Sequence, residues 1–314
     1  MRRQLKDSLK RALFRVYKLA TRMGIHVIPV HYYSPVPNII ELERTKDEWA
    51  KKSELPGLPI DLDQQVENLR AICLPYQGEY AGNAAFCEAV AEHAGPGYGY
   101  VEAQALHSVI RHFKPKRIIE VGSGVSTFCM LTALDLNRKE GGHETTMTCV
   151  EPYPSPRLRN TPRIKLIEKK VQALPVDMFI EIGDGDFLFI DSSHAVKPGS
   201  DVNHLILEVL PRLQPGVIVH FHDIYLPYDY QRDVLKTFLH WSETSLLRAF
   251  LTHNDRVRII FCLSHLHYER CDDLRQVFPE YDPQTGLNGL IPAGTQAFEI
   301  SANHFPSSIY LQTC

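Results

Sequence analysis

Two aspartates at the ends of apolar segments are the residues whose types and spacing could best support chemistry. Asp191 ends the run FLFI and is followed three residues later by His194, and Asp223 ends VIVHFH in a comparable way. A carboxylate that ends a buried strand is costly unless it is paired, hydrogen-bonded or bound to a cation. If the two strands are near neighbours, the carboxylates converge, and two oxygen ligands with open positions suit Mg²⁺ or Mn²⁺. His194, with an ordinary pKa of about 6.5, could then remove a proton from a substrate hydroxyl.

Other interpretations of these residues remain open. On the expected strand, His220 and His222 share one face and Asp223 lies on the other, so His222 and Asp223 should point in opposite directions. We take His222 as a candidate metal ligand and His220 as a core residue. Two histidines with one carboxylate would instead suggest non-haem iron and an oxygenase or hydroxylase. Asp191 could also simply cap the following loop, with His194 on the surface.

A glycine-containing turn occurs earlier in the chain, in EVGSGVST. Gly122 and Gly124 follow an apolar strand and precede a helix, so the backbone there could approach a ligand closely. Thr127 stands where a nicotinamide-binding GxGxxG turn would have its third glycine. An acidic residue two positions before the first glycine, here Glu120, is more typical of an adenosylmethionine site, where it can meet the amino group of the ligand. The alternative is a structural turn that binds nothing.

Two later strand ends could complete the same ligand site. Glu151 ends TMTCVE, where a carboxylate can accept hydrogen bonds from both hydroxyls of a ribose; otherwise it is a surface charge before a turn. Gln172 follows RIKLIEKK, near which an adenine often lies. The expected cofactor-binding residues are therefore Glu120, Gly122, Ser123, Gly124, Ser126, Glu151, Gln172 and Asp191.

Alternating strands and helices must position these residues. We expect helices at 62–76, 83–95, 101–113, 126–137, 199–213, 230–241 and 242–253. We expect strands at 117–121, 146–151, 163–169, 186–191, 217–223, 256–263 and 295–301, the last two as an antiparallel end. This alternation predicts a parallel sheet covered on both faces, which binds ligands at the carboxyl ends of its strands.

Composition excludes several classes of protein. The formal net charge of −3 argues against electrostatic binding of nucleic acid by the whole molecule. The seven cysteines are scattered without a CxxC pair, which argues against a disulfide framework and a structural zinc site and fits a reducing cytosol. No apolar run approaches the length of a membrane span. We therefore predict a cytoplasmic protein, with the inner face of the membrane as a further candidate location.

We do not expect the N-terminal segment MRRQLKDSLKRALFRVYKLATRMG to be a secretory signal, because cations interrupt every candidate apolar core. It predicts a basic amphipathic helix. One face of this helix would carry the apolar residues Leu5, Leu9, Leu13, Tyr17 and Ala20. Another face would carry the basic residues Arg11, Arg15, Lys18 and Arg22. The helix could pack on the domain, make peripheral contact with an anionic membrane, or bind a polyanion or a partner protein.

The order EVGSG, VEP, FID and HD resembles class I adenosylmethionine-dependent methyltransferases. A closer likeness, from about His31 to about Ile300, is to a bacterial group that reads much like IEVGSGVST, FIDSSH and GSDVNHLILEVLPRLQPGVIVHFHDIYLPYDY. That group is similar to metal-dependent O-methyltransferases of catechols and of sugars in natural products. The resemblance implies magnesium ligands at Asp191 and Asp223 and a catalytic histidine at His194. The sequence HD departs from the DN of catechol-type enzymes and the DD of some sugar-type enzymes.

The residues and the resemblance together predict a Rossmann-like, doubly wound α/β fold. Its mostly parallel seven-stranded sheet should have an antiparallel C-terminal strand, and a helical N-terminal extension should precede it. We expect residues 1–105 to form a helical or irregular cap region and residues 106–314 to form an adenosylmethionine-dependent methyltransferase domain.

The expected function is O-methylation of a hydroxyl on a sugar or small natural product, with S-adenosylmethionine as cofactor and Mg or Mn as assisting cation. Expected catalytic residues are His194 and Asp191, and expected metal ligands are Asp191, Asp223 and His222. The expected partner is a small-molecule or glycan acceptor and not nucleic acid, and a homodimer is a further candidate. The alternatives are a non-haem iron oxygenase and a catalytically inactive adenosylmethionine-binding protein.

Overall fold

The structure is a computed structural model that describes residues 2–93, 97–283, 288–292 and 304–314 of the 314-residue chain. Contacts divide the chain into two compact units, Met1–Trp49 and Ala50–Cys314. The first unit contains α1 (Arg2–Arg22), α2 (Ile39–Arg44) and α3 (Lys46–Trp49). The helix predicted for the basic N-terminal segment is therefore confirmed as α1.

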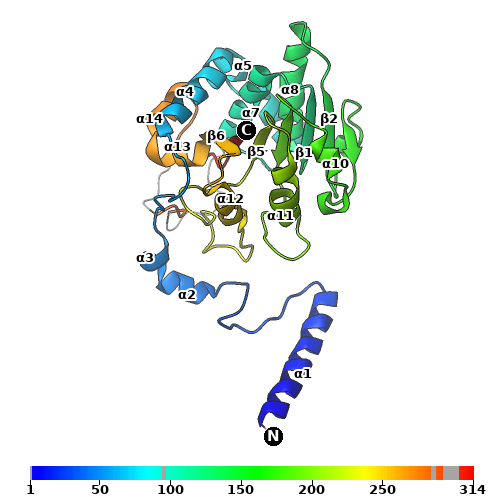
Figure 1. Ribbon diagram of the computed structural model, residues 1–314, viewed down its shortest axis with the longest axis vertical. Helices are drawn as coiled ribbons and strands as arrows, with labels where there is room; N and C mark the ends of the chain where they lie inside the picture. Colours follow the sequence, from blue (N-terminus) through cyan, green and yellow to red (C-terminus); the bar gives the residue numbers. More distant parts are fainter. Residues whose placement is uncertain (1, 94–96, 284–287, 293–303) are drawn as a thin grey trace. The chain divides into compact units, whose positions relative to one another are not determined.

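A seven-stranded sheet forms the centre of the second unit (Figure 1). Its strands are β1 (Arg117–Val121), β2 (Thr146–Val150), β3 (Lys165–Ile167), β4 (Phe187–Ile190), β5 (Ile218–Phe221), β6 (Val257–Cys262) and β7 (Ile309–Thr313). The spatial order is β3-β2-β1-β4-β5-β7-β6, with β1 to β5 parallel and β7 antiparallel to both β5 and β6. The predicted fold class is confirmed.

Helices cover both faces of this sheet because its strands are apolar on both sides. Along β4, Phe187 and Phe189 belong to one core and Leu188 and Ile190 to the other. The first core is covered by α4 (Leu62–Cys73), α5 (Gln77–Tyr80), α6 (Ala84–His93), α7 (Tyr100–Phe113), α8 (Val125–Lys139), α13 (Leu263–Glu269) and α14 (Cys271–Val277). The second is covered by η2 (Val171–Ala173), α10 (Asp177–Ile180), α11 (Asp201–Asn203), η3 (His204–Val209), η4 (Leu210–Arg212) and α12 (Glu243–Leu251). Two short helices, η1 (Leu74–Tyr76) and α9 (Pro156–Arg159), complete the unit.

The helix predicted at 199–213 changes its type along its length. It begins as α11, continues as the π-helix η3 and ends as the 3₁₀-helix η4. Pro211 explains the change near its end, because proline has no N–H and its ring crowds the carbonyl four residues earlier. The N–H of Leu210 accordingly bonds to the carbonyl of Leu205.

Two predictions near the C-terminus fared differently. The helix predicted at 230–241 is wrong, since this segment is a series of turns. Its polar side chains hold it out of a helix: Gln231 accepts a hydrogen bond from the backbone of Trp241 at 2.7 Å. The strand predicted at 295–301 lies outside the described residues. The antiparallel partner of β6 is β7, which sequence analysis missed.

The order of the strands places the predicted site residues together. β1 lies between β2 and β4, so the chain reverses its direction of winding between β1 and β4. Ligands of such sheets bind at this switch point, outside the carboxyl ends of the strands. Backbone hydrogen bonds align the ends of the strands. The N–H of Asp191 donates to the carbonyl of Val121 at 2.8 Å, and the N–H of His222 donates to the carbonyl of Ile190 at 2.9 Å.

Candidate functional site

Two cavities open at the carboxyl edge of the sheet, and Asp191 lines both of them. The first, of about 410 Å³, lies over the ends of β1, β2 and β4. The second, of about 510 Å³, lies over the ends of β4 and β5. A side chain shared by two cavities places their contents next to each other, so a group bound in one can react with a group bound in the other.

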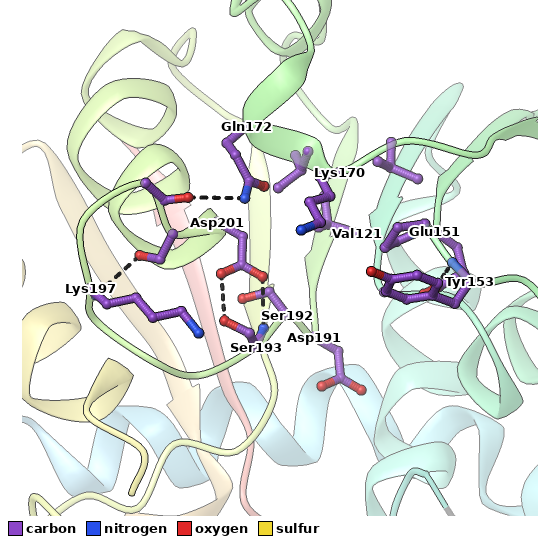
Figure 2. A pocket seen from close by; sticks show the side chains of 16 residues that line it. Val121, Glu151, Tyr153, Lys170, Gln172, Asp191, Ser192, Ser193, Lys197 and Asp201 are labelled. Carbon is purple, nitrogen blue, oxygen red and sulfur yellow. Dashed lines mark hydrogen bonds between the residues drawn. The ribbon is translucent and has the colours of Figure 1, made fainter. Parts of the chain in front are cut away.

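Glu151 and Gln172, which the sequence predicted as cofactor-binding residues, both line the first cavity (Figure 2). The two carboxylate oxygens of Glu151 accept backbone hydrogen bonds from Ser123 at 3.2 Å and Tyr153 at 2.8 Å. Each oxygen keeps a further lone pair for a ligand hydroxyl. Gln172 donates from Nε2 to the carbonyl of Gly199 at 3.1 Å, which holds its amide at the wall of the cavity.

Gly122 also lines this cavity, and two observations explain why it is glycine. Its φ of +79° lies in the left-handed region, which side chains disfavour. A Cβ at this position would stand 1.7 Å from the backbone carbonyl oxygen of Asp191. The missing side chain therefore lets the turn after β1 approach the end of β4.

Glu120 and Ser126, which the sequence predicted as cofactor-binding residues, are not among the residues that line the cavity. Glu120 is completely buried, and its carboxylate accepts hydrogen bonds from Ser126 at 2.7 Å and Thr127 at 2.6 Å, and from the Cys149 thiol at 3.2 Å. Burial raises the pKa of Glu120 to about 7 despite these donors. Glu120 therefore links the end of β1 to the start of α8 and to β2.

The remaining turn residues support the cavity through the backbone. The N–H of Ser123 orients Glu151, and that of Gly124 donates to the Thr127 hydroxyl at 3.0 Å. Thr127, at the position where a dinucleotide turn has glycine, thus links the turn to Glu120. Neither Ser123 nor Gly124 is among the residues that line the cavity.

A compact cluster of acidic residues and histidines forms the floor of the second cavity. Nε2 of His194 lies 3.2 Å from Oδ1 of Asp191 and 3.5 Å from Oδ2 of Asp223. One ligand atom from each of these three residues lies within 4.8 Å of the other two, a spacing that could hold a metal ion. The sequence predicted this convergence of Asp191 and Asp223.

The expectation that His222 and Asp223 point in opposite directions is wrong. β5 ends at Phe221, and Asp223 has a φ of +55°, so the alternation of a strand no longer applies. Nδ1 of His222 lies 3.4 Å from Oδ2 of Asp223 and 3.5 Å from Oδ1 of Asp191. His222 therefore joins the cluster, whereas His220 is completely buried and stacks on Phe189, as expected for a core residue.

Neighbouring hydroxyls fix the orientation of Asp223. Its Oδ1 accepts hydrogen bonds from Tyr225 at 2.9 Å and from Ser307 at 3.0 Å. Oδ2 is thereby directed towards the two histidines. The left-handed backbone of both Asp223 and His194, each with a φ of +55°, is a conformation that costs energy and recurs at functional sites.

Two glutamates in this region escaped sequence analysis. Glu243, the first residue of α12, places Oε2 2.8 Å from Nδ1 of His194, and Glu102 of α7 lies 3.2 Å from Nε2 of His222. Both are buried. No short motif identifies either glutamate, because each lies far along the chain from its histidine. The one sequence feature that could have pointed to them is an acidic residue near the start of an amphipathic helix, which is weak evidence for a functional role.

The opposite charges in the cluster control its pKa values. Burial alone would lower the pKa of His194, but hydrogen bonds with Asp191 and Glu243 and the charge of Asp223 raise it to about 10. Burial alone would raise the pKa of Asp191, but the charge of His222 and the bond with His194 hold it below its ordinary value. The charges of Glu102, Asp223 and Asp191 likewise raise the pKa of His222, so both histidines favour the protonated form beside the aspartates.

Comparison with known proteins identifies the class of the domain. Residues 119–224, which run from β1 past Asp223, match a family model described as a methyltransferase domain. The chain therefore contains a methyltransferase domain, and its matched part includes the turn, Glu151, Asp191 and Asp223.

A sequence relative matches a longer part of the chain than the family model does. An uncharacterized protein of Archaeoglobus fulgidus is 30% identical over 182 residues, which cover 53% of this chain and 78% of the relative. The chain belongs to the same family as this archaeal protein.

Two solved structures are similar to part or most of the chain. One is MycE methyltransferase of the mycinamycin pathway, in complex with Mg, SAH and mycinamycin VI. It is 16% identical, and the match covers 44% of this chain and 38% of the MycE chain, with a TM-score of 0.31. A proposed methyltransferase from Thermobifida fusca is 10% identical, and the match covers 85% of this chain and 96% of that protein, with a TM-score of 0.35. At these scores, neither structure bears on the substrate.

Proposed function

We propose that this protein transfers the methyl group of S-adenosylmethionine to a hydroxyl of a sugar or small natural product, with the assistance of a divalent cation. The observation that supports this most directly is the position of Asp191, which lines both the cavity beside Glu151 and the cavity that contains the cluster. A donor in the first cavity and an acceptor in the second would meet at this side chain.

The first cavity fits the donor in chemistry and in size. Glu151 can accept hydrogen bonds from two ribose hydroxyls, and Gln172 offers an amide near the place expected for an adenine. A cavity of about 410 Å³ lies in the range typical of small-molecule sites. The donor supplies an electrophilic methyl group on its sulfonium, and the chain contributes position and alignment.

The cluster fits a hard divalent cation. Asp191 and Asp223 would supply carboxylate oxygens, and His222 could supply a nitrogen, which leaves room for water or an acceptor oxygen. When bound, such a cation would favour the ionised form of the acceptor hydroxyl. It would also replace the protonated histidines as the countercharge of the two aspartates.

His194 is the residue that we propose as the general base. Its Nδ1 is held by Glu243, so Nε2 faces the cluster and is the atom that can take a proton. A pKa near 10 would keep Nε2 protonated at neutral pH, but a cation on the carboxylates would lower it. When bound, the donor would supply the methyl group that an acceptor oxygen attacks, and Nε2 of His194 would take the proton that the acceptor hydroxyl loses.

Aromatic side chains in the second cavity suit a sugar or a phenol as the acceptor. Tyr225, Trp241 and Phe305 line it, and the rings of Tyr225 and Phe305 are parallel to within 4°. Flat apolar surfaces beside charged groups pack against the faces of sugar rings or of aromatic rings, while the polar groups bind hydroxyls.

A non-haem iron oxygenase is the second candidate. It is favoured by the presence of two histidines, His194 and His222, beside the same carboxylates. It gives no role to the cavity beside Glu151 and does not explain the match to a methyltransferase domain.

Calorimetry with the full chain tests the proposal. We expect adenosylmethionine to bind, and Glu151→Ala to weaken binding about tenfold to a hundredfold, because charge-assisted hydrogen bonds are lost. Glu181→Ala, which removes an exposed carboxylate that is not among the residues lining the cavity, should leave the affinity unchanged. Mg²⁺, Mn²⁺ and Fe²⁺ are titrated separately.

A transfer assay then uses labelled donor with a panel of catechols and sugars, with and without a chelator. Transfer that requires Mg²⁺ or Mn²⁺ supports the proposal. Binding of iron without binding of the donor would refute it in favour of the oxygenase, and transfer that survives the chelator would refute the role of the cation alone.

A further inference from the structure

The N-terminal helix α1 carries a continuous apolar face that is exposed to solvent. Leu9, Leu13, Val16 and Leu19 are spaced by three or four residues, so they lie on one side of the helix. Each is between 46% and 61% exposed. Four large aliphatic side chains in one row are an apolar patch of a kind that soluble surfaces seldom present without a function.

Positive charge flanks this apolar face. Residues 9–22 include five basic side chains and no acidic one (Lys10, Arg11, Arg15, Lys18 and Arg22). The whole chain has a net charge of −3, so the positive charge is concentrated here and is not a general property of the molecule. The basic residues fall on the sides of the helix away from the leucines, which gives a helix with one apolar and one cationic face.

The segment after α1 also exposes apolar and aromatic side chains. The chain turns at Gly24, where the N–H of Ile25 donates to the carbonyl of Ala20 at 2.9 Å. Val30, Tyr32 and Tyr33, which follow, are 77% to 92% exposed. Tyrosine is enriched at the boundary between lipid and water, because its ring is apolar and its hydroxyl is polar.

We propose that α1 and the segment that follows it bind the surface of an anionic lipid bilayer, with α1 lying in the interface. None of the described helices has the length and hydropathy of a membrane span. Binding to nucleic acid would leave the leucine row unexplained. Pairing with a second copy of α1 through the leucine row would leave the cationic face unexplained, because residues 9–22 offer no acidic side chain to it.

Co-sedimentation of the full chain with vesicles tests this inference independently of any methyl transfer. We expect binding to vesicles of phosphatidylcholine and phosphatidylglycerol and little binding to phosphatidylcholine alone. The variant Leu9→Ala/Leu13→Ala keeps a high helix propensity but removes apolar surface, and it should weaken the partition coefficient about tenfold or more. The variant Lys10→Gln/Arg15→Gln/Arg22→Gln should weaken it by about a hundredfold.

Matched controls change the same residue types elsewhere. Leu74→Ala/Leu207→Ala alters two other exposed leucines, and Lys165→Gln/Lys169→Gln/Arg256→Gln removes the same charge from the second unit. Both should bind vesicles as the wild type does. The inference is overturned if neither vesicle binds, if the alanine variant binds unchanged, or if a control variant loses binding equally. It is also overturned if α1 instead drives dimer formation that the alanine variant abolishes.

Discussion

Nδ1 of His194 lies 2.8 Å from Oε2 of Glu243, a buried carboxylate contributed by the first residue of α12. The contact is reinforced through the backbone, because the carbonyl of His194 accepts hydrogen bonds from Ser242 at 2.9 Å and Glu243 at 3.1 Å. The start of α12 is therefore attached to the loop that carries His194. This fixes which imidazole nitrogen faces Asp191 and Asp223.

We expect Glu243→Gln to lower the pKa of His194 from about 10, because the variant removes both a hydrogen bond and a negative charge that favour the imidazolium. The pKa is measured by NMR titration of the histidine ring. Glu208→Gln, at an exposed glutamate that pairs with Arg212, is the control and should leave the titration as in the wild type. An unchanged pKa in Glu243→Gln would show that the contact does not control His194.

Asp223→Asn should weaken Mn²⁺ binding about tenfold or more, since it replaces a charged oxygen ligand by a neutral amide. Tyr225 and Ser307 can still donate to the remaining oxygen, so the fold should be retained. The affinity is measured by electron paramagnetic resonance of free Mn²⁺. Asp229→Asn, an exposed aspartate nearby in the chain, serves as the control. Equal Mn²⁺ affinity in both variants would remove Asp223 from the proposed ligand set.

Gly122→Ala should lower the free energy of unfolding by about 2 kcal/mol or more. The left-handed backbone alone costs about 1–2 kcal/mol for a residue with a side chain, and the new Cβ would also meet the carbonyl oxygen of Asp191. Urea unfolding provides the measurement. Gly183→Ala, where a Cβ meets nothing within 4 Å, should change stability far less. Similar losses in the two variants would contradict the close approach inferred at Gly122.

Glu120 should make stability depend on pH between about 4.5 and about 7. Its pKa rises from 4.5 to about 7 in the folded state, so in this interval the folded chain holds a proton that the unfolded chain has lost. The free energy of unfolding therefore falls as pH rises through the interval, by about 3 kcal/mol in total, and Glu120 adds no further change above it.

Glu120→Gln removes this titration. The variant should match the wild type near pH 4.5 and exceed its stability by about 3 kcal/mol at pH 8, as measured by urea unfolding across the range. Glu181→Gln, at an exposed position, should follow the wild-type curve. A difference between Glu120→Gln and wild type that does not change with pH would mean that Glu120 is ionised when buried.

Local patterns predicted the parallel strands β1, β2, β4 and β5 and their carboxyl ends. They predicted that Asp191 and Asp223 converge if β4 and β5 are neighbours, which the pairing of these strands confirms. Strand periodicity and the parallel arrangement require these features, because apolar strands joined by helices must align their ends on one edge. Glu151 and Gln172, which the same patterns predicted as cofactor-binding residues, line the first cavity.

Only the tertiary structure determined the positions of Glu120, His222 and Glu243. Glu120 lies inside the turn and not on the cavity, because Ser126, Thr127 and Cys149 converge on it from two elements. His222 turns towards Asp191 because the chain leaves β5 in a left-handed conformation, which no alternation rule describes. Glu243 reaches His194 across 49 residues of sequence. Sequence periodicity determines which residues share a face, but contacts between distant segments depend on how loops close, and that is set only when the whole chain packs.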